Sequence, residues 1–462
     1  MTLIKSISGI RGTIGGEIGD NLTPIDLVKF ASAYAAWLKE CKPNKKLTVV
    51  VGRDARISGE MVSSIVEGSL LSMGVDVINI GLASTPTTEM AVIGKGADGG
   101  LILTASHNPS QWNALKLLNE KGEFLNDIQG KRVLEIADKN LYQFVSVEEI
   151  GMVVERSCYD SEHIDAVLAL KDVDVELVKS RKFKVVVDAV NSVGGVVIPA
   201  LLERMGVEVV RLNCEPNGMF AHNPEPLAEN LTEISKLVVE VGADLGVVVD
   251  PDVDRLALVN PDGSMFGEEY TLVAVADYIL SKTSGNTVSN LSSSRALADV
   301  TASYGGEYSA AAVGEVNVVA KMNEVGAIIG GEGNGGVIFP ELHSGRDALV
   351  GVALILTHLA EQKVSLLKLK ERYPKYHISK NKIELTPNIN VDEVLVAVKA
   401  KYSSEKINDI DGVKIDFPTE WVHLRKSNTE PIIRIYSESR DKVAADNLAK
   451  NIITDINLIC KL

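Results

Sequence analysis

The sequence predicts an α/β protein with three similar mixed α/β domains in series and a C-terminal α+β domain. An apolar, β-branched run is followed by a polar loop, a helical segment, a glycine and a second β-branched run, and this order occurs three times. Residues 375–462 lack it. A strand, a helix and a second strand in this order form a βαβ unit, whose two strands pair in parallel.

Each copy is located by its apolar run. The predicted strands and helices are 46–51 (KLTVVV) and 60–73 in the first copy, 184–187 (KVVV) and 196–205 in the second, with a weaker third copy within 287–308. The spacing is too long for a solenoid, so each copy is read as a domain of its own. The predicted domains are 1–152, 153–257, 258–372 and 373–462.

Composition excludes several functional classes. The chain has 462 residues, with 47 Lys and Arg against 62 Asp and Glu, a formal net charge of −15. We therefore expect no nucleic-acid partner and no attraction to anionic membranes, and any phosphate must be bound by local cations and backbone N–H groups. The N-terminus lacks a secretory signal, and four scattered cysteines suit reduced thiols. A cytoplasmic protein is expected.

The first candidate site lies in LILTASHNPSQWNALK, residues 101–116. Three apolar residues at its start predict a short buried strand, and Pro109 disfavours helix at the residue before it, so a turn follows. Ser106 and His107 then lie at a strand end, where open α/β sheets place their chemistry. With Lys116 ten residues on, Ser106 is a candidate nucleophile. The alternative is a polar turn with an incidental serine.

Three carboxylates directly follow three valines in VVVDPDVDR. Asp250, Asp252 and Asp254 alternate, so on an extended segment they share one face. Three such charges repel each other unless a cation holds them, and hard oxygen ligands suit Mg²⁺. An EF-hand is excluded because Arg255 stands at the sixth loop position, where glycine is required. Arg255 is expected to face a bound phosphate. The alternative is an acidic, solvated turn.

A glycine-rich stretch, residues 329–337, surrounds Glu332 and Asn334 with five glycines. Glycine allows a ligand to approach the backbone closely, and a carboxylate with an amide suits adjacent sugar hydroxyls. The alternative is a glycine-rich hairpin. The following HSGRD carries His343, either a proton carrier or a structural histidine, and Arg346, a candidate substrate-binding residue.

Two arginine-bearing segments are candidates for binding phosphate. Arg11 lies between glycines in SGIRG, which predicts a tight loop that presents the guanidinium; an exposed terminal arginine is the alternative. RKSNTEP, followed by IIR, has the hydroxyls, amide and guanidinium groups of a phosphate cradle, or else is a helix cap before an edge strand. Its candidate residues are Arg425, Ser427, Asn428, Thr429 and Arg434.

TASHNP, DPDVDR, GEGNGG and RKSNTEP follow one another, one in each predicted domain. Through these four motifs the whole chain resembles the α-D-phosphohexomutase family, which includes phosphoglucomutases, phosphomannomutases and phosphoglucosamine mutases. The resemblance implies four domains in a heart-shaped molecule around a central cleft. We expect a monomer or a homodimer.

The resemblance also implies a mechanism. Ser106 carries a phosphate and passes the phosphoryl group to a sugar monophosphate; the bisphosphosugar then returns its other phosphate to the serine. Mg²⁺ and a bisphosphosugar activator, glucose or glucosamine 1,6-bisphosphate, are expected cofactors. The implied catalytic residues are Ser106, His107, Lys116 and Arg11; the metal ligands are Ser106, Asp250, Asp252 and Asp254; the substrate-binding residues are Arg255, Glu332, Asn334, His343, Arg346, Arg425, Ser427, Asn428, Thr429 and Arg434.

The sequence departs from the family pattern in two places. The usual opening F-G-T-x-G-x-R-G is K-S-I-S-G-I-R-G here, so Arg11 keeps its place among altered neighbours. In the sugar loop, usually G-E-x-S-G-H, Asn334 and Gly336 stand in the serine and histidine places. A proton-transfer role of that histidine would pass to His343 or Lys116. The GEGNGG form resembles the archaeal-type branch.

We therefore expect an enzyme, an intramolecular phosphotransferase that interconverts hexose 6-phosphate and hexose 1-phosphate. Glucosamine phosphate is the expected substrate, with phosphomannomutase/phosphoglucomutase as the alternative. No residue located in the sequence is expected to contact the substituent at the sugar C2 position, which distinguishes these substrates. A serine phosphatase, which would release inorganic phosphate, and a non-catalytic sugar-phosphate binder, which would tolerate Ser106→Ala, are alternatives from other classes.

Overall fold

The structure, a computed structural model, describes residues 2–6, 9–384, 389–426 and 432–460. The chain divides into two compact units. Unit 1 comprises Met1–Ile279 with Asn334–Lys370, and unit 2 comprises Leu280–Gly333 with Glu371–Leu462.

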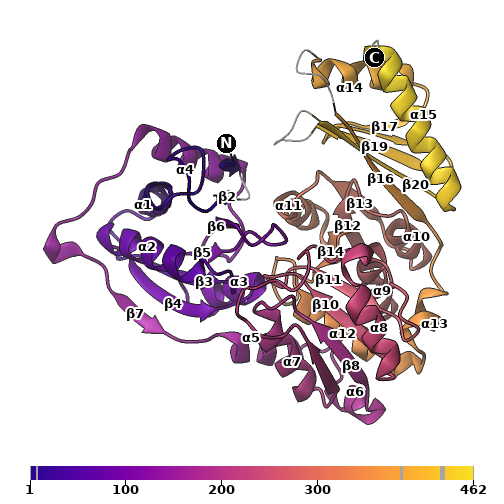
Figure 1. Ribbon diagram of the computed structural model, residues 1–462, viewed down its shortest axis with the longest axis horizontal. Coiled ribbons are helices and arrows are strands. Elements are labelled where there is room, and N and C mark those ends of the chain that lie inside the picture. Colours follow the sequence, from indigo (N-terminus) through magenta and orange to yellow (C-terminus); the bar gives the residue numbers. More distant parts are fainter. Residues whose placement is uncertain (1, 7–8, 385–388, 427–431, 461–462) are drawn as a thin grey trace. The chain divides into compact units, whose positions relative to one another are not determined.

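The first sheet of unit 1 has seven strands in the order β1-β2-β6-β5-β3-β4-β7 (Figure 1). The pairs β3–β4, β3–β5 and β4–β7 are parallel, whereas β5–β6, β2–β6 and β1–β2 are antiparallel. The strands are β1 (Ile4–Ser6), β2 (Gly9–Thr13), β3 (Thr48–Arg53), β4 (Asp76–Leu82), β5 (Gly99–Leu103), β6 (Trp112–Leu118) and β7 (Val153–Arg156).

Helices cover both faces of this sheet, which is why its central strands are apolar on both sides. Val49 and Val51 pack into one core with α1, α2 and α4, and Val50 packs into another with α3. Helix α1 begins at Pro24 because Thr23 and Asp26 form a capping box. The helices are α1 (Pro24–Cys41), α2 (Gly59–Ser72), α3 (Thr85–Gly94) and α4 (Asp127–Lys139).

The second sheet of unit 1 has the order β11-β10-β8-β9, with β8, β9 and β10 parallel and β11 antiparallel to β10. In each sheet a parallel strand is therefore followed by a polar loop. Strand β5 precedes the loop with Ser106, and β10 precedes the loop with the three aspartates. The remaining elements with residues in unit 1 are η1 (Val147–Glu149), α5 (Asp160–Leu168), α6 (Val175–Arg181), β8 (Lys184–Asp188), α7 (Gly194–Arg204), β9 (Glu208–Leu212), η2 (Ala228–Asn230), α8 (Thr232–Glu240), β10 (Leu245–Val249), β11 (Leu256–Val259), α9 (Glu268–Lys282), β15 (Gly336–Ile338), α12 (Ala348–Gln362) and α13 (Leu366–Lys370).

Unit 2 contains the third group of parallel strands, in which β12 pairs with both β13 and β14. It also holds an antiparallel sheet in the order β16-β20-β19-β18-β17, whose apolar face packs against α14 and α15. The elements are β12 (Asn286–Asn290), α10 (Ala296–Ser303), β13 (Tyr308–Ala311), α11 (Glu315–Val325), β14 (Ala327–Glu332), β16 (His377–Glu384), α14 (Val391–Lys401), β17 (Lys406–Asn408), β18 (Val413–Asp416), β19 (Trp421–Lys426), β20 (Ile432–Ser439) and α15 (Lys442–Cys460).

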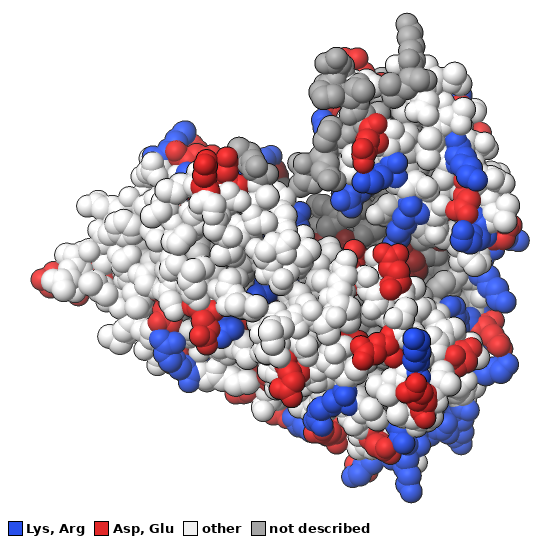
Figure 2. All heavy atoms as spheres, viewed as in Figure 1, with Lys and Arg blue, Asp and Glu red and all other residues white. Residues whose placement is uncertain are grey.

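The predicted fold class is confirmed. The three parallel pairs β3–β4, β8–β9 and β12–β13 are the strands of the three predicted βαβ copies, and the C-terminal sheet is antiparallel. Within the described ranges, no helix is both long and apolar enough to cross a bilayer. On the face drawn in Figure 2, acidic and basic side chains are interspersed.

Candidate functional site

Ser106 lies in the turn that follows β5, as the sequence predicts. We call residues 104–109 the serine loop. The serine is 9% exposed and has φ of 49°, in the left-handed region that residues other than glycine rarely adopt. Its hydroxyl donates a hydrogen bond of 2.7 Å to Asp250 Oδ2 and lies 3.3 Å from His107 Nδ1. The nucleophile candidate therefore points directly at the aspartates.

The three aspartates lie in residues 250–255, the acidic loop after β10, and all three are fully buried. The prediction of an extended segment is wrong. The loop is a turn, in which the N–H of Val253 donates to the carbonyl oxygen of Asp250 (3.1 Å) and Val253 has φ of 64°. The carboxylates converge because the backbone folds around Asp250, whose Oδ1 accepts from the N–H groups of Asp254 (3.2 Å) and Arg255 (3.1 Å).

The acidic loop fits a divalent cation. One carboxylate oxygen from each aspartate lies within 4.8 Å of the others. Among the described residues, Asp252 Oδ1 and Asp254 Oδ1 are buried without a hydrogen-bond partner. Burial, together with the charges of Asp254 and Asp252, raises the pKa of Asp250 well above its usual range. Converging hard oxygens whose own charges repel are the donor set that Mg²⁺ favours.

Lys116 supplies part of the countercharge. It lies on β6 opposite Ile102 of β5, and its Nζ is 2.7 Å from Asp252 Oδ2 and 3.6 Å from Asp254 Oδ2. Burial alone would lower its pKa, but the two carboxylates raise it above its usual value. Reciprocally, Lys116 outweighs the effect of burial on Asp252 and holds the pKa of that carboxyl low. Lys116 is therefore positively charged at neutral pH in this arrangement.

Arg346 pairs with the third aspartate. Its Nη2 donates to Asp254 Oδ2 at 2.7 Å, and the residue is 9% exposed. A Cβ atom at Gly336 would lie 2.3 Å from Arg346 Cδ, so the arginine side chain fills the space that a side chain at position 336 would need. Asn334 holds this turn, because its Oδ1 accepts from the N–H of Gly336 at 3.1 Å.

Three further predicted residues belong to this region. Arg255 Nη1 lies 3.5 Å from Glu225 Oε1. Burial, followed by the nearby charge of Arg255, lowers the pKa of His107 well below its usual range, and Arg11 contributes in the same direction. The tight loop predicted around Arg11 is wrong: the residue lies within β2, opposite Ala114 of β6, because the preceding strand β1 pairs with this segment.

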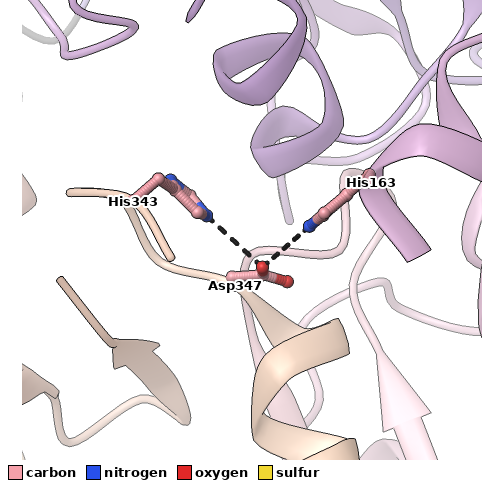
Figure 3. Close-up of side chains that lie close together, drawn as sticks. All are labelled: His163, His343 and Asp347. Carbon is pink, nitrogen blue, oxygen red and sulfur yellow. Dashed lines mark hydrogen bonds and ion pairs between the residues drawn. The ribbon is translucent and has the colours of Figure 1, made fainter. Parts of the chain in front are cut away.

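His343 lies between two carboxylates, one of which, Asp347, is shared with His163 (Figure 3). Its Nδ1 lies 3.3 Å from Glu89 Oε2 and its Nε2 3.3 Å from Asp347 Oδ2, which also lies 2.9 Å from His163 Nε2. Burial alone would lower the pKa of His343, but the two carboxylates raise it to about 10. Asp347 also caps α12 by accepting from the N–H of Leu349. This arrangement favours the structural alternative for His343, and its substrate-binding role stays a prediction.

The other predicted residues lie in unit 2 or outside the described residues. Glu332 is 4% exposed and accepts from Asn290 Nδ2 (2.8 Å) and the N–H of Gly314 (3.1 Å). Arg425 Nε lies 2.8 Å from Asp411 Oδ2, and Arg425 faces Arg434 across the β19–β20 pair. Ser427, Asn428 and Thr429 fall outside the described residues.

Sequence reasoning missed three polar residues that contact this site. Thr85 Oγ1 donates to Asp252 Oδ2 (2.6 Å), Thr104 Oγ1 accepts from the N–H of Ser106 (2.9 Å), and Arg56 donates to carbonyl oxygens of the serine loop. Each of them lies just beyond the carboxyl end of a parallel strand, β4, β5 or β3. That position was the available signal, since such loops meet at one edge of a sheet.

Four domain profiles match successive parts of the chain. They are those of phosphoglucomutase/phosphomannomutase alpha/beta/alpha domains I (residues 3–143), II (161–263) and III (267–376) and its C-terminal domain (382–454).

Curated relatives match over nearly the whole length. A phosphoglucomutase/phosphomannomutase of Thermococcus kodakarensis is 36% identical, covering 95% of this chain and 94% of the relative. A phosphoglucosamine/phosphogalactosamine mutase of Sulfurisphaera tokodaii is 34% identical, covering 96% and 97%. The crystal structure of a phosphoglucomutase/phosphomannomutase family protein from Burkholderia thailandensis has a TM-score of 0.86 and 26% identity, covering 100% of this chain and 98% of that one. The chain belongs to the phosphoglucomutase/phosphomannomutase family, within the α-D-phosphohexomutases.

Proposed function

We propose that this protein is a phosphohexomutase that interconverts hexose 6-phosphate and hexose 1-phosphate through a phosphoserine at Ser106 and a bisphosphosugar intermediate. The observation that carries this proposal is the 2.7 Å hydrogen bond between the Ser106 hydroxyl and one of three converging, buried carboxylates. A nucleophile joined to a Mg²⁺-type site is the arrangement that phosphoryl transfer requires. Mg²⁺ bound by Ser106, Asp250, Asp252 and Asp254 would supply positive charge to the transferring phosphoryl oxygens.

The residues of unit 1 can be assigned to the steps of this reaction. In the first half-reaction the P–O bond to Ser106 Oγ breaks, a P–O bond to the sugar hydroxyl forms, and the proton lost by that hydroxyl is balanced by the proton that Ser106 Oγ gains. Lys116, which is protonated beside Asp252, is placed to neutralise or protonate the departing serine oxygen. His107, whose pKa is lowered, is the neutral group beside that oxygen. The second half-reaction reverses these steps at the other sugar oxygen.

The arginines are assigned to phosphate. Arg346, Arg255 and Arg11 place positive charge around the acidic loop and His107. In unit 2, Arg425 and Arg434 face each other on neighbouring antiparallel strands. Asp411 holds Arg425 from one side, and an anion between the two arginines would meet two guanidinium groups. We assign this pair to the phosphate that is not reacting, and Glu332 and Asn334 to the sugar hydroxyls.

We propose glucosamine phosphate as the preferred substrate. The Sulfurisphaera relative is named for glucosamine and galactosamine phosphates, and a 32% identical protein of Methanopyrus kandleri is named a probable phosphoglucosamine mutase. The 36% identical Thermococcus relative instead favours a phosphomannomutase/phosphoglucomutase, which is the second candidate. The enzyme is proposed to act in the cytoplasm, as a monomer or homodimer, with a 1,6-bisphosphosugar as activator.

Coupled assays test the proposal. Glucosamine 6-phosphate, glucose 1-phosphate and mannose 1-phosphate are supplied separately, each with a 1,6-bisphosphosugar primer and Mg²⁺. Highest kcat/KM on glucosamine 6-phosphate supports the first candidate, whereas preference for mannose or glucose 1-phosphate supports the second. Release of inorganic phosphate without isomer formation would identify a phosphatase, and binding without turnover a non-catalytic protein; either result overturns the proposal.

A further inference from the structure

Arg56 lies beneath the serine loop, and all three nitrogens of its guanidinium group donate hydrogen bonds. The residue is 1% exposed. Two of its nitrogens donate to four backbone carbonyl oxygens of residues 106–112, and Nε donates to Asp54 Oδ2 at 2.9 Å. The accepting carbonyls are those of Pro109 (2.8 Å) and Trp112 (3.0 Å) for Nη1, and of Asn108 (2.8 Å) and Ser106 for Nη2. All five N–H directions of the planar guanidinium therefore meet an oxygen.

The same network also holds the amide of the serine. Asp54 Oδ2 accepts from Thr104 Oγ1 at 2.7 Å, and Thr104 Oγ1 accepts from the N–H of Ser106 at 2.9 Å. The N–H and the C=O of Ser106 are thus both fixed through Asp54 and Arg56. The left-handed backbone of Ser106 is strained and persists only where its surroundings over-determine it. Arg56 and Thr104 are those surroundings.

A loop after β9 covers the outer side of this arginine. The guanidinium carbon of Arg56 lies 5.1 Å from the centroid of the Phe220 ring, a cation–π distance. The loop can approach so closely because residue 218 is glycine: a Cβ there would lie 2.0 Å from the carbonyl oxygen of Ala55. Arg56 is therefore enclosed between the serine loop and Phe220, and its position is fixed from both sides.

We propose that Arg56 is a positioning residue for phosphoryl transfer at Ser106, an inference that rests on the proposed function. It sets the backbone of the serine loop, and through it the direction of the Ser106 hydroxyl toward Asp250. Lysine cannot replace it, because an ammonium is a point charge with three donors, whereas the acceptors here form a fork around a plane. The sugar-phosphate contacts assigned above do not involve Arg56, so its loss acts on the chemical step and leaves substrate binding in place.

Arg56→Lys and Arg56→Met test this inference. Misplacing a reacting group by about 1 Å costs roughly 100-fold in rate, so kcat is expected to fall about 100-fold, with KM changed less than about twofold. The rate at which a 1,6-bisphosphosugar phosphorylates Ser106, followed by intact mass, is expected to fall in parallel. The matched control is Arg53→Lys at the end of β3, three residues before Arg56, since Arg53 pairs at 3.3 Å with the exposed Glu60. Its kcat is expected to stay within about twofold of the unmodified enzyme, because an ion pair whose carboxylate is exposed to solvent contributes little.

Thr104 provides an independent test in case the Arg56 variants fail to fold. Thr104→Ser keeps the hydroxyl that links Ser106 to Asp54 and is expected to retain kcat, whereas Thr104→Val removes it and is expected to lose about tenfold or more, again at unchanged KM. Folded Arg56→Lys with kcat within threefold of the unmodified enzyme overturns the inference. So does a Thr104→Val variant that equals Thr104→Ser. Failure of the proposed function itself is seen separately, as absence of mutase activity in the unmodified protein.

Discussion

Gly336→Ala is expected to break the contact between Arg346 and the acidic loop. The φ of Gly336 is not in the left-handed region, so alanine is compatible with the backbone and the effect is steric. The new methyl would lie 2.3 Å from Arg346 Cδ and 3.0 Å from its Cγ, well inside van der Waals contact. Arg346 must therefore move and lose its 2.7 Å hydrogen bond to Asp254 Oδ2.

The size of the effect follows from two terms. A hydrogen bond to a charged group contributes about 1.5–3 kcal/mol, and overpacking a buried site costs about 1–3 kcal/mol. Because moving the arginine relieves the overpacking as it breaks the bond, the two do not add fully, and we expect a loss of about 3 kcal/mol in the free energy of unfolding of unit 1. The measurement is urea denaturation read by hydrogen exchange of peptides from β10 and the acidic loop.

A double-mutant cycle makes the reasoning refutable. In an Arg346→Ala background the space is empty, so adding Gly336→Ala is expected to cost less than about 0.5 kcal/mol. The matched control is Gly68→Ala within α2, where a Cβ meets nothing within 4 Å; it is expected to be neutral or to gain up to about 1 kcal/mol from helix propensity. An equal loss from Gly336→Ala with and without Arg346 would refute the steric account.

Three further outcomes are expected. Ser106→Ala removes the proposed acceptor oxygen, so bisphosphosugar treatment should leave the intact mass unchanged and mutase activity should be lost nearly completely; retained activity would contradict the phosphoserine. Removal of divalent cations with EDTA should abolish turnover and Mg²⁺ should restore it, while Asp254→Asn should weaken Mg²⁺ binding measured by calorimetry. Because Glu89 and Asp347 raise the pKa of His343 to about 10, its protonated form stabilises the fold fully below pH 6.5, and this stabilisation is lost as pH rises toward 10. His343→Gln should therefore destabilise more at pH 6 than at pH 10; a pH-independent loss would contradict the ion pairing.

The sequence predicts best what is encoded by adjacent residues. Ser106 follows β5 and the aspartates follow β10, because a short apolar run before a polar turn specifies both strand and loop locally. The closeness of Lys116 to Asp252 depends on the pairing of β6 with β5, which no local pattern in the sequence specifies.

The other features of the site depend on contacts between segments that are far apart in the sequence. Arg11 entered a strand because β1 and β6 provide partners that no local pattern shows. The aspartates converge through a turn rather than an extended segment, because Val253 adopts a backbone conformation that its own β-branched side chain disfavours. The contact between Thr85 and Asp252 has no local sequence signal, because the two residues are 167 positions apart. The roles of Glu332 and Arg425 stay predictions.

Asp254 receives its arginine from a segment 92 positions further along the chain. During synthesis, a ribosome-bound intermediate that ends shortly after β11 already contains Ser106, Lys116 and the whole acidic loop. It already has Lys116 and Arg255 near Asp254, but it still lacks Arg346, which lies 2.7 Å from Asp254 Oδ2. Such a half-made polypeptide has three carboxylates against two cations at this position, and the charges balance only once Arg346 has been synthesised and donates to Asp254.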